Sequence, residues 1–387
     1  MTIPLSGILI PLFLWVQWRV TVGLFDRARQ RFSGAALAAV RAAVLVFGAL
    51  ALAGFLLGLP EGFSFPRLPG TVYLFATAAA LMYFATAATV LVVSNAVWHI
   101  RTRFARRMDP GRRRFLSAAG NILAASPLAI AAGGFVARTS FRVHQIDVPI
   151  AGLAASLDGL RILHLSDIHL SAFLTERQFA RVVDASNELR ANLGVVTGDL
   201  ISGVGDPLDA CIRQLARLRA DAGIFGCMGN HEIYVGGEAY VQAACARNGI
   251  RFLRGQASPL RFGDATLNLA GVDYQAKGPQ ASYLHGAQRL VAPGALNLLL
   301  SHSPDVFPVA ARQGYQLMLA GHTHGGQVTI EILEQTVNPA RFFTRYIHGL
   351  YRLGGAAAYV TRGIGTIGIP ARIGALPEIT VVRLRKA

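Results

Sequence analysis

The sequence predicts an α/β domain in its C-terminal part, preceded by an all-α transmembrane region. Beyond residue 157, short runs rich in Val, Leu and Ile alternate with amphipathic stretches, which is typical of buried strands joined by crossover helices. Before residue 137 the apolar segments are much longer, long enough to cross about 30 Å of hydrocarbon. The expected division is a membrane region, 1–114, a fourth apolar segment, 115–137, a linker, 138–156, and the α/β domain, 157–387.

Three segments of the first third are predicted to span a membrane: 3–24, 40–59 and 71–97. The whole chain is 53% hydrophobic with a mean hydropathy of +0.42, and the excess lies in these segments. Trp15, Trp18 and Trp98 lie near their ends, where interfacial aromatic residues are common. A buried helix of a soluble protein is the alternative for any one segment, but three in succession with few charges between them favour the membrane.

The positive charge of the chain follows membrane topology. Residues 1–145 contain 15 Arg and 3 acidic residues, and most of the Arg residues cluster at 27–31 and 101–114. The positive-inside rule places both clusters in the cytoplasm and the amino terminus outside. We therefore expect a multi-pass membrane protein with the lipid bilayer as a partner. A nucleic-acid partner is not expected.

The fourth apolar segment, 115–136, directly follows Arg112, Arg113 and Arg114. Twin arginines before Phe-Leu and an Ala-rich stretch resemble an internal twin-arginine export signal. A basic stop at a membrane border is the alternative, and the sequence leaves both open. Either interpretation sends the following domain out of the cytoplasm, and we expect the segment to be retained as an anchor.

Metal-ligand side chains follow five of the predicted strands, 161–165, 193–197, 224–228, 296–300 and 316–320. In open α/β sheets, ligands bind beyond the carboxyl ends of strands, so these side chains are expected to converge. Stretches 176–190 and 206–219 are predicted as helices between the strands, and a second sheet is expected after residue 250. The candidate ligands, in chain order, are Asp167, His169, Asp199, Asn230, His302, His322 and His324.

This set of oxygen and nitrogen ligands favours two divalent ions such as Mn, Fe or Zn. Two dications about 4 Å apart repel each other by roughly 16 kcal/mol at an effective dielectric near 20, so a carboxylate must bridge them. Asp199 is the expected bridge, with a bridging hydroxide as the nucleophile. His231 directly follows Asn230, too close for both to reach one ion comfortably, and is therefore expected to give a proton to the leaving oxygen.

The segments Asp-x-His, Gly-Asp, Gly-Asn-His-Glu, Ser-His and Gly-His-x-His occur in this order, and the chain resembles the calcineurin-like metallophosphoesterases over residues 161–385. The resemblance implies a β-sandwich flanked by helices. It also implies a first metal on Asp167, His169, Asp199 and His324, and a second on Asp199, Asn230, His302 and His322. Glu232 stands where many members have Asp, as the residue that would orient His231. The closing segment, 359–379, is similar to the tail of bacterial membrane-associated or exported members, which implies a bacterial inner membrane for this chain.

Other polar residues have a structural interpretation beside the functional one. Arg362 and Arg372 can clamp a substrate phosphate, or can be solvated or structural. His164 lies inside an apolar strand and is expected to be a core histidine. The three cysteines, Cys211, Cys227 and Cys245, have neither disulfide-framework nor zinc-knuckle spacing.

The sequence thus predicts a membrane-anchored dimetal phosphoesterase. Its substrate is expected to be a phosphate ester, with a phosphodiester or lipid-linked phosphate favoured because the tether keeps the site near such compounds. Two alternatives remain at this stage. One is an extracytoplasmic phosphomonoesterase, and the other is a non-catalytic metal-binding scaffold or sensor, which would need neither His231 nor a complete ligand set.

Overall fold

A computed structural model describes residues 5–57, 70–104, 129–332 and 335–387, together with residues 111, 118 and 122. The chain divides into two compact units, Met1–Phe135 with Gly368–Pro370, and Val136–Ile367 with Ala371–Ala387. Most of the fourth apolar segment predicted at 115–136, and the arginines at 112–114, lie outside the described residues. The described part of that segment, residues 118, 122 and 129–136, is helical.

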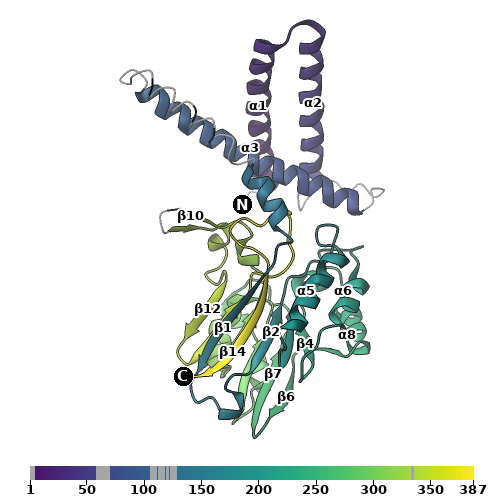
Figure 1. The fold of residues 1–387 in the computed structure, drawn as a ribbon, viewed down its shortest axis with the longest axis vertical. Helices are drawn as coiled ribbons and strands as arrows, with labels where there is room; N and C mark the ends of the chain where they lie inside the picture. Colours follow the sequence, from purple (N-terminus) through teal and green to yellow (C-terminus); the bar gives the residue numbers. More distant parts are fainter. Residues whose placement is uncertain are drawn as a thin grey trace. The chain divides into compact units, whose positions relative to one another are not determined.

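Within its described residues, the first unit contains three long helices, α1 (Leu5–Arg31), α2 (Gly34–Leu57) and α3 (Gly70–Phe104). Only Phe32 and Ser33 separate α1 from α2, so the two helices run antiparallel and side by side (Figure 1). Within the described ranges, three stretches are long and apolar enough to cross a membrane: Gly7–Arg31, Gly34–Leu57 and Phe75–His99. They coincide with the three predicted spans.

These helices pack through aromatic rings and small residues. Phe13 of α1 stacks on Phe55 of α2 with ring centroids 4.3 Å apart. A Cβ atom on Gly54 would lie 2.6 Å from the carbonyl oxygen of Ala76, so only glycine allows α2 and α3 to approach this closely. Such small-residue contacts are typical of helix packing in membranes.

The second unit is built on two six-stranded sheets. The first has the order β1-β14-β2-β3-β4-β5. Strands β2 to β5 are mutually parallel, and β14 is antiparallel to β2. The strands are β1 (Arg142–Ile150), β2 (Arg161–Leu165), β3 (Leu193–Thr197), β4 (Ile224–Cys227), β5 (Ile250–Phe252) and β14 (Glu378–Lys386).

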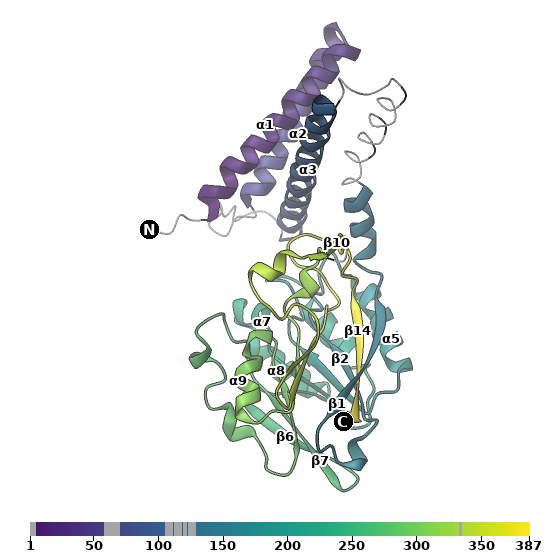
Figure 2. The ribbon, with the colours of Figure 1, turned by 90° about the vertical axis from the view of Figure 1, so that its left-hand side faces the viewer.

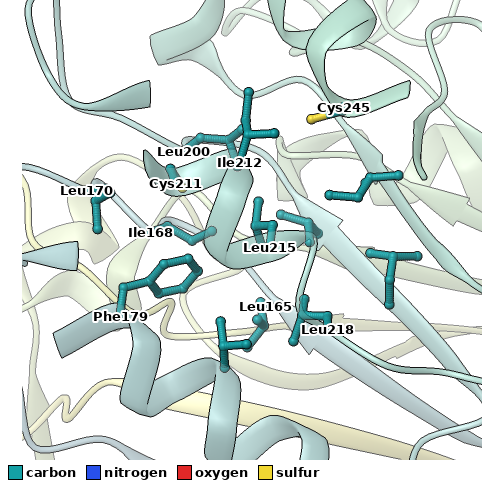
Figure 3. Close-up of a cluster of buried hydrophobic side chains, with 14 of the residues drawn as sticks. Leu165, Ile168, Leu170, Phe179, Leu200, Cys211, Ile212, Leu215, Leu218 and Cys245 are labelled. Carbon is teal, nitrogen blue, oxygen red and sulfur yellow. The ribbon is translucent and has the colours of Figure 1, made fainter. Parts of the chain in front are cut away.

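Helices α5 (Glu176–Glu188), α6 (Leu208–Leu215) and α8 (Glu238–Arg247) cover one face of this sheet. Their apolar stripes meet side chains of alternate strand positions, as Figure 3 shows for Phe179 and Leu215 around Leu165. Helix α5 begins at a capping box, in which Thr175 and Gln178 satisfy each other's backbone amides. The second sheet covers the other face, so the first sheet is buried on both faces. This explains why its strands are continuous apolar runs in the sequence.

The second sheet has the order β12-β13-β9-β8-β7-β6 and packs against the inner face of the first through a shared apolar cluster. Its strands are β6 (Gln256–Phe262), β7 (Ala265–Gly271), β8 (Leu296–Leu300), β9 (Leu317–Ala320), β12 (Gly349–Leu353) and β13 (Ala356–Val360). Helix α9 (Phe307–Gln313) packs on its outer face. A β-hairpin of β10 (Ile330–Ile332) and β11 (Gln335–Val337) follows β9. The predicted sandwich flanked by helices, the second sheet and the five ligand-bearing strands are confirmed.

Within residues 138–156, expected to be a linker, Arg142–Ile150 form strand β1 of the first sheet. β1 pairs in parallel with the C-terminal strand β14 over nine residues, and the two lie side by side in both views (Figures 1 and 2). The sequence of β1 does not have the apolar pattern of a buried strand, because only Val148 and Ile150 are buried. Pro149 and the polar residues before it are compatible with an edge strand.

Candidate metal centre

The seven predicted ligands come together at the carboxyl ends of strands from both sheets. They lie just beyond β2, β3 and β4 of the first sheet, and β8 and β9 of the second. Six of them are buried with at most 5% exposure, and His322 is half-buried. Three overlapping groups of side chains in the described residues have ligand atoms within 4.8 Å of one another: Asp167, His169 and His324; His169, Asp199 and His231; and Asp199, His302 and His322.

On one side of the centre, two imidazoles and two carboxylates converge. The Nε2 atoms of His169 and His324 are 3.1 Å apart. His324 Nε2 lies 3.3 Å from Asp167 Oδ1, and His169 Nε2 lies 3.5 Å from Asp199 Oδ2. The four side chains thus point their ligand atoms at a common point.

On the other side, the same carboxylate oxygen meets a second set. His302 Nε2 is 3.1 Å from Asp199 Oδ2 and 3.1 Å from Asn230 Oδ1. The Nδ1 atom of His322 lies 3.2 Å from His302 Nε2. Because Asp199 Oδ2 belongs to both sets, it lies where a bridging ligand would be needed.

The spacing of these atoms fits metal ions. Around an ion bound at about 2.1 Å, neighbouring ligand atoms lie about 3.0 Å apart in octahedral and about 3.4 Å apart in tetrahedral coordination. The distances of 3.1 to 3.5 Å within each set fall in or next to this range. Mixed carboxylate, amide and imidazole ligands suit Mn, Fe or Zn.

Electrostatics also favour cations here. Burial lowers the pKa of His169 to about 3 and that of His322 to about 4, so both imidazoles stay neutral and able to ligate. Burial also acts to lower the pKa of His302, but the Asp199 and Asp167 carboxylates and the Thr197 carbonyl together outweigh it and raise the pKa to about 10. A positive charge beside Asp199 is therefore strongly stabilised.

The backbone is strained where the ligands lie. Five ligand residues have a positive φ, a conformation that is uncommon for side-chain-bearing residues and costs of order 1–3 kcal/mol each. These are Asp167 (50°), His169 (47°), Asp199 (55°), His322 (75°) and His324 (52°). Strained residues cluster at active sites and ligand clamps, so their concentration on the predicted ligands favours a functional site.

Comparison with known proteins agrees with this geometry. The family described as Calcineurin-like phosphoesterase matches residues 160–326. A metallophosphoesterase of Bacillus subtilis, YkuE, described as uncharacterized, is 30% identical over 282 residues, which cover 71% of this chain and 97% of that protein. The chain belongs to the calcineurin-like phosphoesterase family.

Two further members of the calcineurin-like family differ in length. A zebrafish (Danio rerio) transmembrane protein with a metallophosphoesterase domain is 31% identical, with 64% of this chain and 58% of that protein aligned. The phosphodiesterase YaeI of Escherichia coli is 29% identical, with 58% and 82% aligned.

Neighbouring groups fix how the rings of this calcineurin-like site point. His302 Nδ1 lies 2.6 Å from the carbonyl oxygen of Thr197, and His169 Nδ1 lies 3.2 Å from Ser202 Oγ, so each ring turns its Nε2 inward. The backbone N–H of His322 donates to both carboxylate oxygens of Asp167 at 3.0 Å. Such outer contacts orient ligands and tune their basicity.

His231 lies at the edge of the centre with 15% of its side chain exposed. Its Nδ1 is 2.6 Å from the carbonyl oxygen of Ser202, and its Nε2 faces Asp199 Oδ2 at 4.0 Å. Ser202 therefore orients the ring. The expectation that Glu232 does so is wrong.

Glu232 has another role, which follows from its complete burial. Its carboxylate accepts hydrogen bonds from the backbone N–H groups of Asp199 (2.9 Å), Leu200 (2.7 Å) and Gly229 (2.8 Å). It thereby clasps the loop after β3 to the start of α7 (Asn230–Tyr234).

Arg372 is also structural. Only 1% of the residue is exposed, and its guanidinium donates to the carbonyl oxygens of His324 (2.6 Å), Ala375 (3.2 Å) and Gly365. It supports the His324 turn, and its donors are already used, so the expected phosphate clamp at this residue is wrong. Arg362 Nη2 lies 2.6 Å from His348 Nε2, and a phosphate contact by Arg362 stays a prediction.

Two tyrosines of the site are missed by sequence reasoning. The ring of Tyr274 lies 5.3 Å from that of His322 and 6.0 Å from that of His302. Tyr234 lies 5.7 Å from His231 and 6.5 Å from Tyr274. Tyr274 follows β7 as the ligands follow their strands, which is the signal that could have found it.

His164 is a buried core residue, with Nε2 2.8 Å from Thr197 Oγ1.

Proposed function

We propose that this chain is a membrane-anchored dimetal phosphoesterase that hydrolyses phosphodiesters or lipid-linked phosphates. One observation carries the proposal: Asp199 Oδ2 lies 3.1 Å from His302 Nε2 and 3.5 Å from His169 Nε2, within two separate ligand sets. The family membership and the apolar helices support it. The Escherichia coli relative bears the name phosphodiesterase, which favours diesters.

Two divalent ions would be held by these side chains, with the first on Asp167, His169, Asp199 and His324, and the second on Asp199, Asn230, His302 and His322. When bound, Mn, Fe or Zn supplies Lewis acidity that activates water and stabilises charge on a phosphoryl group. The protein's own contribution is to offer three imidazoles that burial keeps neutral, a fourth at His302, and one shared carboxylate at fixed spacing.

His231 is the proposed proton donor. Because Ser202 accepts a hydrogen bond from Nδ1, the other ring nitrogen is free to face the reacting group. Its Nε2 faces Asp199 Oδ2 at 4.0 Å, and partial exposure of the side chain leaves room for a leaving group. In this geometry His231 can protonate the departing oxygen without binding metal.

The location of the site is a further part of the proposal. Seven Arg residues lie between Arg101 and Arg114, before the fourth apolar segment, and this asymmetry supports a catalytic domain outside the cytoplasm of a bacterial cell. The substrate would then be an extracytoplasmic phosphate ester.

Hydrolysis by the full chain in detergent tests the proposed function. We expect metal-dependent cleavage of bis-p-nitrophenyl phosphate with Mn, Fe or Zn, faster than cleavage of p-nitrophenyl phosphate. His285→Ala, at a histidine outside the site, is the matched control and should retain the rate. Faster monoester cleavage would instead favour the phosphomonoesterase, and metal binding without any hydrolysis would favour the scaffold.

A further inference from the structure

Two neighbouring phenylalanines of the catalytic unit are turned into solvent. Phe342 is 89% exposed and Phe343 is 70% exposed, at the end of a short 3-10 helix, Pro339–Phe342. Adjacent, almost fully exposed aromatic side chains are unusual for a soluble surface and mark an interaction site. We propose that the segment 338–347, the Phe segment, docks on an anionic phospholipid bilayer by inserting these two rings among the headgroups.

The charges around the rings fit this partner. Arg341 and Arg345 flank them and are exposed, and residues 338–347 include no acidic residue. Exposed Lys277 adds a third cation, with its Nζ donating to the carbonyl oxygen of Phe343 at 2.9 Å. Aromatic rings framed by basic residues combine apolar insertion with attraction to anionic lipid.

The outward direction of the rings is built into the segment. The next residues turn inward: Ile347 is buried, and the Tyr346 ring packs 5.8 Å from Phe307 and 5.0 Å from Tyr351. Thr344 Oγ1 donates to Asp305 Oδ1 at 2.6 Å. The segment therefore holds a fixed backbone while it presents Phe342 and Phe343 to the outside.

Both ends of the Phe segment are attached to the turn that carries His322 and His324. Asn338 Nδ2 donates to the carbonyl oxygen of Gly325 at 2.9 Å, and the Thr323 hydroxyl donates to the carbonyl oxygen of Ile347. A bilayer that receives the phenylalanines would therefore lie next to the metal centre. If the proposed function holds, this arrangement favours phosphate esters embedded in a membrane over freely diffusing ones.

A lipid bilayer is the partner within reach. The chain itself carries three helices able to cross a membrane, so the catalytic unit is tethered to a bilayer surface. Insertion of two rings would add an independent contact whose strength depends on anionic lipid. A protein surface covering the rings is the competing occupant, and the experiment separates the two.

Lipid quenching of a label at position 342 tests the docking. Cys211, Cys227 and Cys245 are each fully buried, so Phe342→Cys gives the full chain one exposed thiol for a fluorophore. Leu353→Cys is the matched control. Leu353 is 44% exposed and is the last residue of β12, whereas the Phe segment precedes the first residue of that strand. Both proteins are placed in phosphatidylcholine vesicles, with or without phosphatidylglycerol, that carry nitroxide-labelled lipids.

We expect nitroxide lipids to quench the label at 342 severalfold more than the label at 353, and more strongly with phosphatidylglycerol. Arg341→Gln with Arg345→Gln should reduce the difference. Equal quenching at the two positions would overturn the proposal. So would a label at 342 that is shielded from acrylamide in water yet unaffected by nitroxide lipids, because a protein surface would then cover it.

A second measurement links docking to catalysis while keeping the two proposals separable. Phe342→Ser with Phe343→Ser should slow hydrolysis of a vesicle-embedded phosphodiester severalfold and leave bis-p-nitrophenyl phosphate hydrolysis unchanged. Equal loss on both substrates would contradict the docking role. Absence of any hydrolysis by the parent chain would contradict the proposed function alone, because lipid quenching does not require catalysis.

Discussion

The Nε2 atoms of His169 and His324 face each other at 3.1 Å, although 155 residues separate them in the chain. Two neutral imidazole nitrogens this close repel unless a proton or a cation lies between them. Burial holds the pKa of both rings below the ordinary value, so both stay neutral and are able to ligate a metal ion. Asp199 Oδ2 likewise lies 3.1 Å from His302 Nε2 and 3.5 Å from His169 Nε2, where a cation would be stabilised on either side.

Asp199→Asn should lower the metal content of the purified chain from near two ions toward one or none. The change removes the shared negative charge that offsets the repulsion between two dications, roughly 16 kcal/mol at an effective dielectric near 20. Elemental analysis after gel filtration measures it, with His285→Ala as the control. Two tightly retained ions in the Asn variant would contradict a bridging role.

His231→Ala should keep both metals and lose roughly 100-fold or more in rate, the usual scale for a general acid. The loss should be smaller for nitrophenyl esters than for alkyl esters, because a good leaving group needs less protonation. Steady-state rates on both ester types measure it. Equal losses would argue against proton donation, and loss of metal would make His231 a ligand.

Arg372→Met should weaken the first metal more than the second. The buried guanidinium supports the His324 turn, and its removal leaves several carbonyl oxygens without a donor, at about 1–3 kcal/mol each. We expect a lower midpoint of thermal unfolding in detergent and a loss of about 10-fold or more in first-ion affinity. Arg181→Met, at an exposed arginine of α5, is the control. An unchanged first-ion affinity would sink the positioning role.

Glu232→Gln should destabilise the loop that carries Asp199. The amide of Gln offers one acceptor oxygen and places two donors against backbone N–H groups, at a cost of about 1–3 kcal/mol for each unsatisfied group. Thermal unfolding and metal content should both fall. Wild-type stability together with wild-type metal content would show that the clasp is dispensable.

The membrane orientation is tested with a reporter that is active only outside the cytoplasm. Fused after Thr139 it should be active, and fused after Asp109 it should be silent, because seven Arg residues at 101–114 hold that side in the cytoplasm. The reverse pattern would place the catalytic domain inside the cell.

The strands and the ligands could be predicted because their signals are local. Each ligand follows an apolar run, as Asp199 follows β3, and the Gly-His-Thr-His segment is specific in itself. The pairing of β1 with β14 could not be predicted, because it joins segments more than 200 residues apart and β1 is largely exposed.

The contacts that orient the side chains of the site could not be predicted either, because they also depend on tertiary structure. His231 is held by the carbonyl oxygen of Ser202, a backbone group that every residue possesses and that leaves no mark in a sequence. The structural role of Arg372 depends on its burial, which cannot be predicted from the charge of the residue. Tertiary packing, rather than residue type, decides these roles.

The most direct test of the central claim is a crystal structure of the Mn-loaded chain with anomalous scattering. The proposed dimetal centre predicts two Mn peaks about 3.5–4 Å apart, with Asp199 as their shared ligand. Asp167, His169 and His324 should bind one ion, and Asn230, His302 and His322 the other. A single peak, or two peaks that do not share Asp199, would contradict the account.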